Sequence, residues 1–490
     1  MSLTKVSFSM IQGAMFNILD YGAVGNGVAN DTAAIQAALD AAGVNGGCVY
    51  IPTGAYKTTA TLTIPQLASI KGASAEGSII RPTGCDGLEF DAADSIGPRV
   101  FEDFFVYGDT TSTNTGIKFV GDADPATRVS GLRFNRIKIQ NFRDAMNFRS
   151  MWTSSIQNCV LYFNVLGIVL RGQCVKVDVN DNYILHNLLG TVTPTATGIT
   201  IESTFDYDPG GTTEKRPEDI QIHQNLVFGF PYGCRLNNGL VLSVNNNDFD
   251  AVTHTGIFVS SMGGLTSINE NWIGLVGASP VNGILLDALG ASNDVQKNII
   301  GNQITNTGTT AAFGIYAYSQ QNNINIIGND ISGTNADIQV QNCGDVVVSG
   351  NLCKSTTNNS IYVIGTLATR TIEIANNRCS ALLNISPTNG SQINLGQNDG
   401  DNSTLIRGRS VLLTGATTVT TTYASLTTTQ PNFAQASNFI VPRLFVQTPT
   451  QNIGAVWGSA NDSQVTINCG TAPATDMFIY WEVKGFQTTL

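Results

Sequence analysis

Two carboxylates, Asp248 and Asp250, occupy alternate positions in the segment DFD and are the clearest candidates for chemistry in the sequence. Alternate side chains of a β-strand point to opposite faces, so if Phe249 lies in a core, both aspartates face outward with Cα atoms ~6.6 Å apart. Hydrolysis of a glycosidic bond needs two carboxyl groups about 5 to 5.5 Å apart for retention or about 6.5 to 9.5 Å apart for inversion. The pair therefore predicts an acid–base centre for glycosidic hydrolysis, next to Trp272, whose indole offers a flat face to a sugar ring.

A second group of acidic residues belongs to an inserted loop at residues 203–217, which reads STFDYDPGGTTEKRP. Glu202 stands at the root of this loop and is the third candidate catalytic carboxylate. The loop itself contributes four candidate substrate-binding residues, which are Asp206, Tyr207, Asp208 and Glu214. Loops that project from a rigid scaffold often carry function. A loop carboxylate completes a pair with Asp250 if the loop folds back, or it faces a neighbouring subunit, and the sequence leaves both arrangements open.

Further candidate substrate-binding residues share the strand face expected for Glu202; they are Arg171, Arg235, Asp287, Tyr316 and Tyr318. An equally reasonable role for the arginines is to offset acidic neighbours. His254, one of three histidines, follows the acidic pair in an expected turn, where it is either a catalytic base or a surface turn residue. An outward aspartate near a turn is also commonly a solvated or turn-capping group, and this is the alternative interpretation of the acidic pair.

These residues are positioned by a repeat in which two apolar residues flank an asparagine, as in IQIHQNLVF, LSVNNNDF and INIIGNDI. The asparagines recur mostly every ~22 to 31 residues, a period typical of solenoids. They are Asn135, Asn158, Asn182, Asn225, Asn247, Asn271, Asn302, Asn329, Asn351 and Asn377. Like side chains are expected to stack ~4.8 Å apart in successive coils of a parallel sheet. The asparagine is predicted to form a ladder at a tight turn, where it tolerates a left-handed backbone.

A second phrase, glycine followed by apolar-x-apolar, marks another strand of each coil. It starts at Gly116, Gly167, Gly198, Gly233, Gly256, Gly283 and Gly314. Alternation then points one set of isoleucines inward, namely Ile168, Ile199, Ile257, Ile284 and Ile315. The two phrases together predict an all-β chain wound as a parallel β-helix.

The two ends of the chain depart from the repeat. Residues 31–42 start with Asp-Thr and place the apolar side chains of Ile35, Ala38, Leu39 and Ala42 on one helical face. This pattern predicts a helix that caps the open N-terminal end of the solenoid. After about residue 400 the asparagine phrase stops, and segments such as FIVPRLFVQ and MFIYWEVKGF predict antiparallel strands of a β-sandwich-like domain.

The expected organisation has four parts. A neck segment spans 1–15, the cap and first coil span 16–60, the β-helix with its 203–217 insertion spans 61–405, and the C-terminal domain spans 406–490. The C-terminal domain is expected to serve trimerisation and capping, with glycan binding as the alternative.

Composition narrows the classes of function. The 25 basic and 36 acidic residues give a net charge of −11, which disfavours a nucleic-acid partner. The nine cysteines lack metal-ligand spacing, so neither a disulfide framework, nor a metal site, nor a cofactor is expected. No apolar stretch reaches the length of a membrane span, and the N-terminus lacks the pattern of a secretion signal.

The run FNILDYGAVGNGVANDTAAIQAALDAA, followed by GGCVYIPTGAYKT, resembles the opening of pectate-lyase-superfamily β-helices found in phage tailspikes and depolymerases. The motif covers roughly residues 16–58, and the asparagine phrases extend the likeness to about residue 400. The resemblance implies a right-handed parallel β-helix that forms a homotrimer and recognises bacterial O-antigen or capsule. It also implies a place in the virion tail, because TKVSFSMIQGA is similar to the neck that joins such a helix to a virion anchor or tail adaptor.

Three functions follow, because the superfamily includes hydrolases, lyases, epimerases and non-catalytic adhesins. The first hypothesis is an endo-glycosidase that uses the paired carboxylates on a bacterial surface polysaccharide. The runner-up is a polysaccharide lyase, with His254, Tyr207 or a basic residue as its base and with or without calcium. The third is a glycan-binding adhesin without catalysis.

Overall fold

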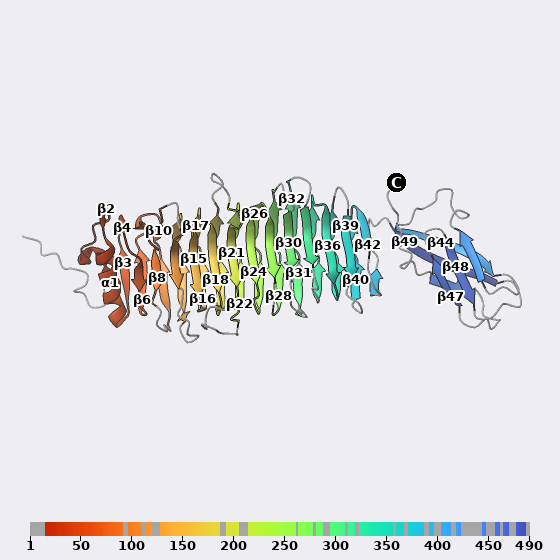
Figure 1. Cartoon of the computed structure of the whole chain (residues 1–490), viewed down its shortest axis with the longest axis horizontal. Coiled ribbons are helices and arrows are strands. Elements are labelled where there is room, and N and C mark those ends of the chain that lie inside the picture. Colours follow the sequence, from red (N-terminus) through yellow and green to blue (C-terminus); the bar gives the residue numbers. More distant parts are fainter. Residues whose placement is uncertain are drawn as a thin grey trace, which may run out of the picture.

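The structure is a computed structural model, and it describes most of residues 15–486 (Figure 1). Inside that range it leaves out 92–96, 110–112, 120–127, 187–192, 205–213, 261–262, 278–280, 288–294, 309–311, 319–322, 356–358, 367–370, 387–391, 396–402, 413–417, 423–442, 447–455, 461–463 and 470–476.

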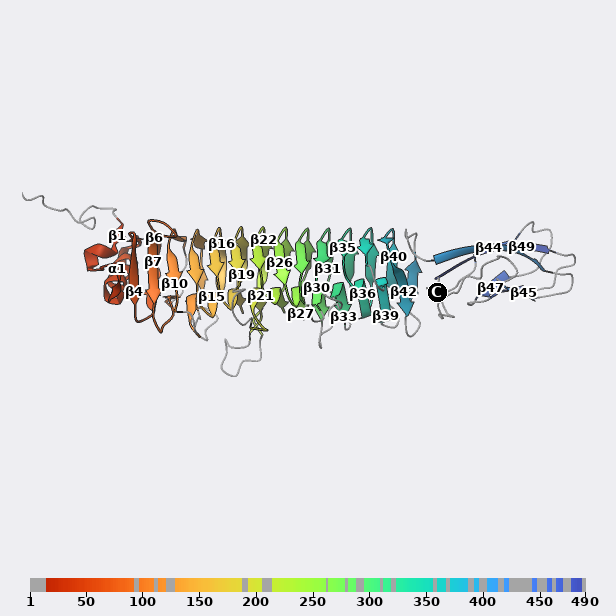
Figure 2. The ribbon, with the colours of Figure 1, turned by 90° about the horizontal axis from the view of Figure 1, so that it is seen from above.

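Three long parallel sheets form the main body, and each coil of the chain adds one strand to each sheet in turn. Figures 1 and 2 show the strands stacked side by side along one axis in two perpendicular views. Sheet A consists of β1 (Phe16–Asn17), β3 (Gly47–Ile51), β6 (Ala68–Gly72), β9 (Arg99–Glu102), β12 (Val129–Ser130), β13 (Leu132–Asn135), β16 (Met151–Gln157), β19 (Val175–Asn180), β22 (Glu218–His223), β25 (Leu242–Asn245), β28 (Thr266–Asn269), β31 (Lys297–Ile300), β34 (Ile324–Ile327), β37 (Val346–Ser349), β40 (Thr371–Ala375) and β43 (Gln392–Leu395).

Sheets B and C complete each coil. Sheet B consists of β2 (Asn26–Asn30), β4 (Gly54–Thr58), β7 (Ser78–Pro82), β10 (Phe105–Tyr107), β14 (Lys138–Gln140), β17 (Val160–Tyr162), β20 (Tyr183–Leu185), β23 (Leu226–Phe228), β26 (Asp248–Val252), β29 (Trp272–Leu275), β32 (Gln303–Asn306), β35 (Asp330–Ser332), β38 (Leu352–Lys354) and β41 (Arg378–Cys379). Sheet C consists of β5 (Leu62–Ile64), β8 (Leu88–Phe90), β11 (Thr115–Phe119), β15 (Asp144–Arg149), β18 (Leu166–Arg171), β21 (Thr197–Glu202), β24 (Tyr232–Asn237), β27 (Thr255–Ser260), β30 (Val281–Asp287), β33 (Ala312–Tyr318), β36 (Ala336–Cys343), β39 (Asn359–Thr366) and β42 (Leu382–Ser386).

The interior is built from columns of apolar side chains that lie in register from coil to coil. In sheet B, Val227 pairs with Phe249, Phe249 with Ile273, and Ile273 with Ile304. All four are buried. The predicted inward isoleucines of sheet C form a second column, which runs from Ile168 through Ile199 to Ile315. The predicted all-β parallel β-helix is therefore confirmed.

The glycine of the second phrase is required by this packing. A Cβ atom placed on Gly198 would lie 2.3 Å from Cγ1 of Val227, a core residue of sheet B. In this coil, only a residue without a side chain leaves room for Val227 at the corner between sheets B and C.

The predicted asparagine ladder exists, but it begins at Asn182, two coils later than predicted. From Asn182 to Asn377, each buried side-chain amide donates from Nδ2 to Oδ1 of the next asparagine, at 2.8 to 3.0 Å. Asn135 and Asn158 lie outside this buried ladder, although Nδ2 of Asn158 donates to Oδ1 of Asn135 at 3.1 Å on the exposed side of the coil. Asn135 lies on β13 and pairs with Gln157, and the backbone N–H that donates to Asn182 belongs to Cys159, the residue after Asn158.

The left-handed backbone also belongs to a different residue than predicted. The residue before each ladder asparagine has a positive φ, as in Asp181 at 54°, Glu270 at 56° and Gly301 at 68°. This residue turns the chain so that the following asparagine points inward, where its amide satisfies buried backbone groups.

The N-terminal helix α1 (Thr32–Asn45) confirms the predicted cap. Ile35, Ala38, Leu39 and Ala42 are buried, and the helix contacts β1, β3, β5 and β6 and the 3-10 turn η2 (Ile18–Tyr21). The apolar end of the solenoid is covered in this way.

The C-terminal segment forms two antiparallel sheets of three strands each. One contains β44 (Ser403–Leu412), β49 (Met477–Phe486) and β46 (Arg443–Val446), and the other contains β45 (Thr418–Thr422), β48 (Gln464–Cys469) and β47 (Val456–Ala460). The two sheets contact each other, as expected for the predicted sandwich-like domain.

One coil carries a carboxyl group where the preceding coil has glycine and the following coil has serine. Asp337 is fully buried on β36, in the position that matches Gly314. Its carboxyl accepts hydrogen bonds from Oγ1 of Thr334 at 2.5 Å and from the N–H of Ser355 at 2.7 Å. Burial raises the pKa of Asp337 to about 7, because these hydrogen bonds offset only part of the desolvation.

We expect this aspartate to make the protein less stable as the pH rises. The folded state keeps the proton up to about pH 7, whereas the unfolded chain loses it near pH 3.8. The contribution of the protonated group is therefore present below about pH 4 and is lost as the pH rises to about 7, a change on the order of 4 kcal/mol. Asp337→Asn imitates the neutral form, so its thermal midpoint should exceed that of the wild type increasingly from pH 5 to pH 8. Parallel pH profiles for the two proteins would contradict the assignment.

Candidate functional site

The predicted carboxylate pair lies on the outer face of sheet B. Asp248 and Asp250 flank the fully buried Phe249 on β26, so both side chains leave the core on the same side. Asp248 pairs in register with Trp272 on β29. Oδ1 of Asp250 accepts a hydrogen bond of 2.6 Å from the N–H of Ala251, whose φ of 54° turns the chain.

Trp272 is held against this pair by a glycine. A Cβ atom on Gly274 would lie 2.5 Å from Cη2 of Trp272 and 2.9 Å from Oδ1 of Asp250. The indole therefore occupies the space that a side chain at position 274 would fill, directly beside the carboxylate. A shallow hollow of about 440 Å³ lies next to the pair, and Leu226, Asp248 and Trp272 are among the residues that line it.

The surroundings of Asp248 favour the protonated form of its carboxyl group. Partial burial, and then the negative charge of Asp250, raise the pKa of Asp248 above its ordinary value, although the side chain keeps contact with solvent. A carboxyl group with a raised pKa next to a second carboxylate is the arrangement that acid–base hydrolysis uses.

Glu202 does not join this pair. It ends β21 in sheet C and pairs through Asn237 with Ser260, the last residue of β27. Asp250 lies before the turn that enters β27, so the length of that six-residue strand, roughly 20 Å, separates the two positions. Glu202 instead forms an ion pair with the adjacent Arg171, with Oε1 and Nε 2.5 Å apart.

The described part of the inserted loop is tied down next to Glu202. Glu214 accepts hydrogen bonds from Oγ of Ser203 and from Nδ2 of Asn238, and it forms an ion pair of 3.1 Å with Arg216. Although burial alone would raise it, these partners hold the pKa of Glu214 below its ordinary value. A carboxylate bound in this way is a structural anchor for the loop. Asp206, Tyr207 and Asp208 lie outside the described residues.

A second cluster gathers around Arg235 on the outer face of sheet C. Its guanidinium lies over the rings of Tyr232 and Phe258, at 4.9 and 5.5 Å from the centroids. His254 packs on Tyr232 with centroids 4.5 Å apart, and its Nε2 is 3.4 Å from the tyrosine hydroxyl. Burial and the charge of Arg235 lower the pKa of His254, which favours a neutral imidazole.

Asp287, Tyr316 and Tyr318 lie farther along the same face. Asp287 pairs in register with Tyr318, and the two tyrosine rings are 5.8 Å apart. Oδ1 of Asp287 is buried and has no hydrogen-bond partner among the residues that the structure describes, and burial raises the pKa of this carboxyl. The hydroxyl of Tyr316 donates to Gln341 at 2.7 Å. This part of the outer face of sheet C thus combines the rings of Tyr316 and Tyr318 with a carboxyl oxygen of Asp287 that accepts no hydrogen bond from the described residues.

Tyr232 and Phe258 were not among the site residues predicted from the sequence. Phe258 is two residues after Gly256, just as Arg235 is two residues after Gly233, so the repeat itself placed the two in one outward column. Tyr232 is the first residue of β24 and directly precedes Gly233, so the glycine phrase could also have identified it.

Two further observations concern ligands and membranes. Within the described ranges, no group of three or more histidine, cysteine, aspartate or glutamate side chains is arranged to hold a metal ion. No helix in the part of the chain that the structure covers is both long and apolar enough to cross a bilayer.

Comparison with known proteins places these faces in context. Residues 15–96 match the family model described as "Rhamnogalacturonase A/epimerase, pectate lyase-like". The tail spike protein of Shigella phage Sf6 is 26% identical over 270 residues, which are 52% of this chain and 42% of that protein. Mannuronan C5-epimerase AlgE5 of Azotobacter vinelandii is 26% identical over 260 residues, which are 50% of this chain and 24% of the epimerase. The chain thus spans less than half the length of these relatives.

The fold agrees with solved tailspikes along almost the whole chain. A tailspike double mutant of the E. coli bacteriophage HK620, in complex with a pentasaccharide, aligns with a TM-score of 0.59 at 12% identity. The alignment covers 96% of this chain and 93% of that one. The chain is therefore similar in sequence to a phage tail spike protein, shares the parallel β-helix fold of solved tailspikes, and opens with a segment that matches a pectate-lyase-like family model.

Proposed function

We propose that this chain binds and degrades a bacterial surface polysaccharide by endo-glycosidic hydrolysis on the outer face of sheet B. The observation that carries the proposal is the pair Asp248 and Asp250 beside the indole of Trp272. The pentasaccharide complexes of the HK620 tailspike and the relatives named mannuronan C5-epimerase support polysaccharide as the class of substrate.

Each group has a defined role in this proposal. Asp248, with its raised pKa, protonates the leaving glycosidic oxygen. Asp250 accepts a proton from a water molecule that attacks the anomeric carbon. The Cα atoms of the two aspartates are ~6.6 Å apart. Side chains that extend in parallel from these positions would place the carboxyl groups near the lower end of the range of about 6.5 to 9.5 Å that leaves room for this water. Trp272 stacks on the sugar ring and orients it.

A polysaccharide lyase is the second candidate, and the cluster around Arg235 favours it. The neutral imidazole of His254 has the protonation state of a base. Within the described part of the chain, Nε of Arg235 is buried and has no hydrogen-bond partner. A guanidinium in that position would neutralise a uronic carboxylate while the adjacent proton is removed. Relatives named mannuronan C5-epimerase and alginate lyase point to the same chemical class.

Product analysis distinguishes these functions. Hydrolysis yields oligosaccharides with saturated reducing ends, whereas elimination yields an unsaturated uronate that absorbs near ~235 nm. We expect saturated products that disappear in Asp250→Asn but persist in His254→Gln. Unsaturated products lost in His254→Gln would instead establish the lyase, and binding without cleavage would leave an adhesin.

We propose a homotrimer in the virion tail, with residues 406–490 contributing to trimerisation and residues 1–15 connecting to a tail adaptor. Sedimentation equilibrium of the full chain tests the trimer, because a monomeric mass would contradict it.

A further inference from the structure

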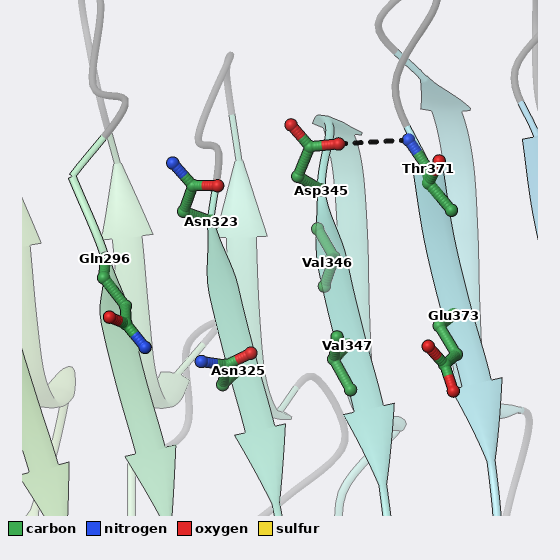
Figure 3. Close-up of a pocket in the computed structure, with 8 residues that line it drawn as sticks. All are labelled: Gln296, Asn323, Asn325, Asp345, Val346, Val347, Thr371 and Glu373. Carbon is green, nitrogen blue, oxygen red and sulfur yellow. Dashed lines mark hydrogen bonds between the residues drawn. The ribbon is translucent and has the colours of Figure 1, made fainter.

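A pocket of about 500 Å³ lies on the outer face of sheet A, on a different side of the coil from the acidic pair (Figure 3). Strands β31, β34, β37 and β40 border it. The pocket is also separated from the acidic pair along the axis of the β-helix. In sheet B, three strands, β29, β32 and β35, lie between β26, which carries the pair, and β38, which belongs to the same coil as β37. This pocket is therefore separate from both clusters described above.

The floor of the pocket is a single apolar side chain between two polar ones. Asn325, Val347 and Glu373 lie in register on β34, β37 and β40 and all point outward. Their outer positions, Asn325 and Glu373, are two coil spacings or ~9.6 Å apart. A pyranose fits this span with its C–H face on the isopropyl group of Val347 and a hydroxyl group directed to each side.

The amide groups on one side are already oriented. Oδ1 of Asn298 accepts hydrogen bonds from Nε2 of Gln296 at 3.1 Å and from Nδ2 of Asn325 at 2.9 Å. This network turns Oδ1 of Asn325 away from Asn298, as an acceptor for a ligand hydroxyl. Side chains fixed in advance lose less entropy when a ligand binds.

The charge of the pocket selects among sugars. Asp345 and Glu373 are its ionisable lining residues, and no basic side chain is among the described residues that line it. Asp345 accepts the N–H of Thr371 at 3.3 Å, as Figure 3 shows. An acidic rim repels uronic acids and favours sugars that offer only hydroxyl or amide groups.

We propose that this pocket is a second, non-catalytic saccharide site that binds a neutral pyranose of the polysaccharide. A holding site on another face would keep the protein attached while the first site releases its product, because the second contact raises the effective concentration of substrate. The site does not require the acidic pair to be catalytic, so either proposal can fail alone.

Ligand-observed saturation-transfer NMR tests the proposal with six neutral probes and one charged probe. The neutral probes are the methyl glycosides of glucose, galactose, mannose, rhamnose, N-acetylglucosamine and N-acetylgalactosamine, and methyl glucuronide is the charged one. In a Trp272→Ala background, which removes the aromatic platform of sheet B, we expect binding of at least one neutral glycoside and weaker binding of the glucuronide. Val347→Asp and Glu373→Ala should each raise the Kd of that glycoside about tenfold.

Ser267→Ala is the matched control, since Ser267 pairs with Asn298 in the same outward column but does not line the pocket. The control should leave the Kd unchanged. The proposal is overturned if none of the six neutral glycosides binds, if binding survives both pocket substitutions, or if the control loses it equally. Turnover of Asp250→Asn, measured separately, decides the catalytic proposal.

Discussion

Replacement of Asp250 by asparagine should lower the rate of polysaccharide cleavage roughly 10²- to 10⁴-fold while polysaccharide binding persists. Asparagine keeps the shape and the hydrogen bond from the Ala251 N–H, but it cannot take a proton from water. Asp248→Asn should lose a similar factor, because it cannot donate a proton to the leaving oxygen. Initial rates of reducing-end release, together with binding to immobilised polysaccharide, measure the two effects.

The pH dependence of the cleavage rate tests the role of Asp248 more specifically. Activity that needs protonated Asp248 falls as the pH rises through its pKa, which burial and the charge of Asp250 hold above the ordinary value. Removing that charge in Asp250→Asn should move the basic limb of the residual activity to lower pH. An unshifted limb would exclude Asp248 as the acid.

Substitutions of two other carboxylates, Asp330 and Glu202, serve as comparisons for the Asp250→Asn experiment. Asp330 lies in the same outward column, two strands beyond Trp272, and forms an ion pair of 2.8 Å with Lys354. Asp330→Asn is the matched control and should retain full activity. Glu202→Gln reports on sheet C, and a loss of turnover there, with an active Asp250→Asn, would move the catalytic centre to that face.

Asn271→Asp should destabilise the β-helix by on the order of 4 kcal/mol. Nδ2 of Asn271 donates to the carbonyl of Val244 at 2.8 Å and to Oδ1 of Asn302 at 2.9 Å, all in the buried ladder. Aspartate lacks the Nδ2 donor, so the carbonyl of Val244 and Oδ1 of Asn302 each lose a hydrogen bond, at about 1–3 kcal/mol apiece, and a carboxyl group faces both acceptors. The backbone N–H of residue 271 still donates to Oδ1 of Asn302 at 3.0 Å.

Guanidinium unfolding followed by circular dichroism measures this loss, as an equilibrium midpoint or as an unfolding rate. Asn298→Asp is the control, because Asn298 lies on the outer face of sheet A and uses its Oδ1 to accept hydrogen bonds, which aspartate preserves. Its stability should stay within about 0.5 kcal/mol of the wild type. Equal unfolding of the two variants would show that the ladder contributes nothing beyond a surface amide.

The candidate site was only partly within reach of the sequence. Alternation around Phe249 placed Asp248 and Asp250 on one outward face, since that inference needs only the geometry of one strand. The relation of Glu202 to Asp250 needed the corner between sheets B and C, which the repeat does not describe. The pocket around Val347 also escaped, because its lining residues are ordinary in each coil and become a site only when four coils are stacked.

The sequence by itself determined the winding of this protein. Side chains at equivalent positions of each coil share one environment, so the apolar columns, the glycine column and the capping helix all left a periodic pattern. Tertiary structure decided where that pattern starts and which faces meet. Asn158 and Cys159 are an example: Asn158 has a φ of 54° and is the turn residue, and the N–H of Cys159, the residue after it, donates to Asn182 in the ladder. A shift of one residue at a left-handed turn exchanges inside for outside, and only the packed coils select between the two registers.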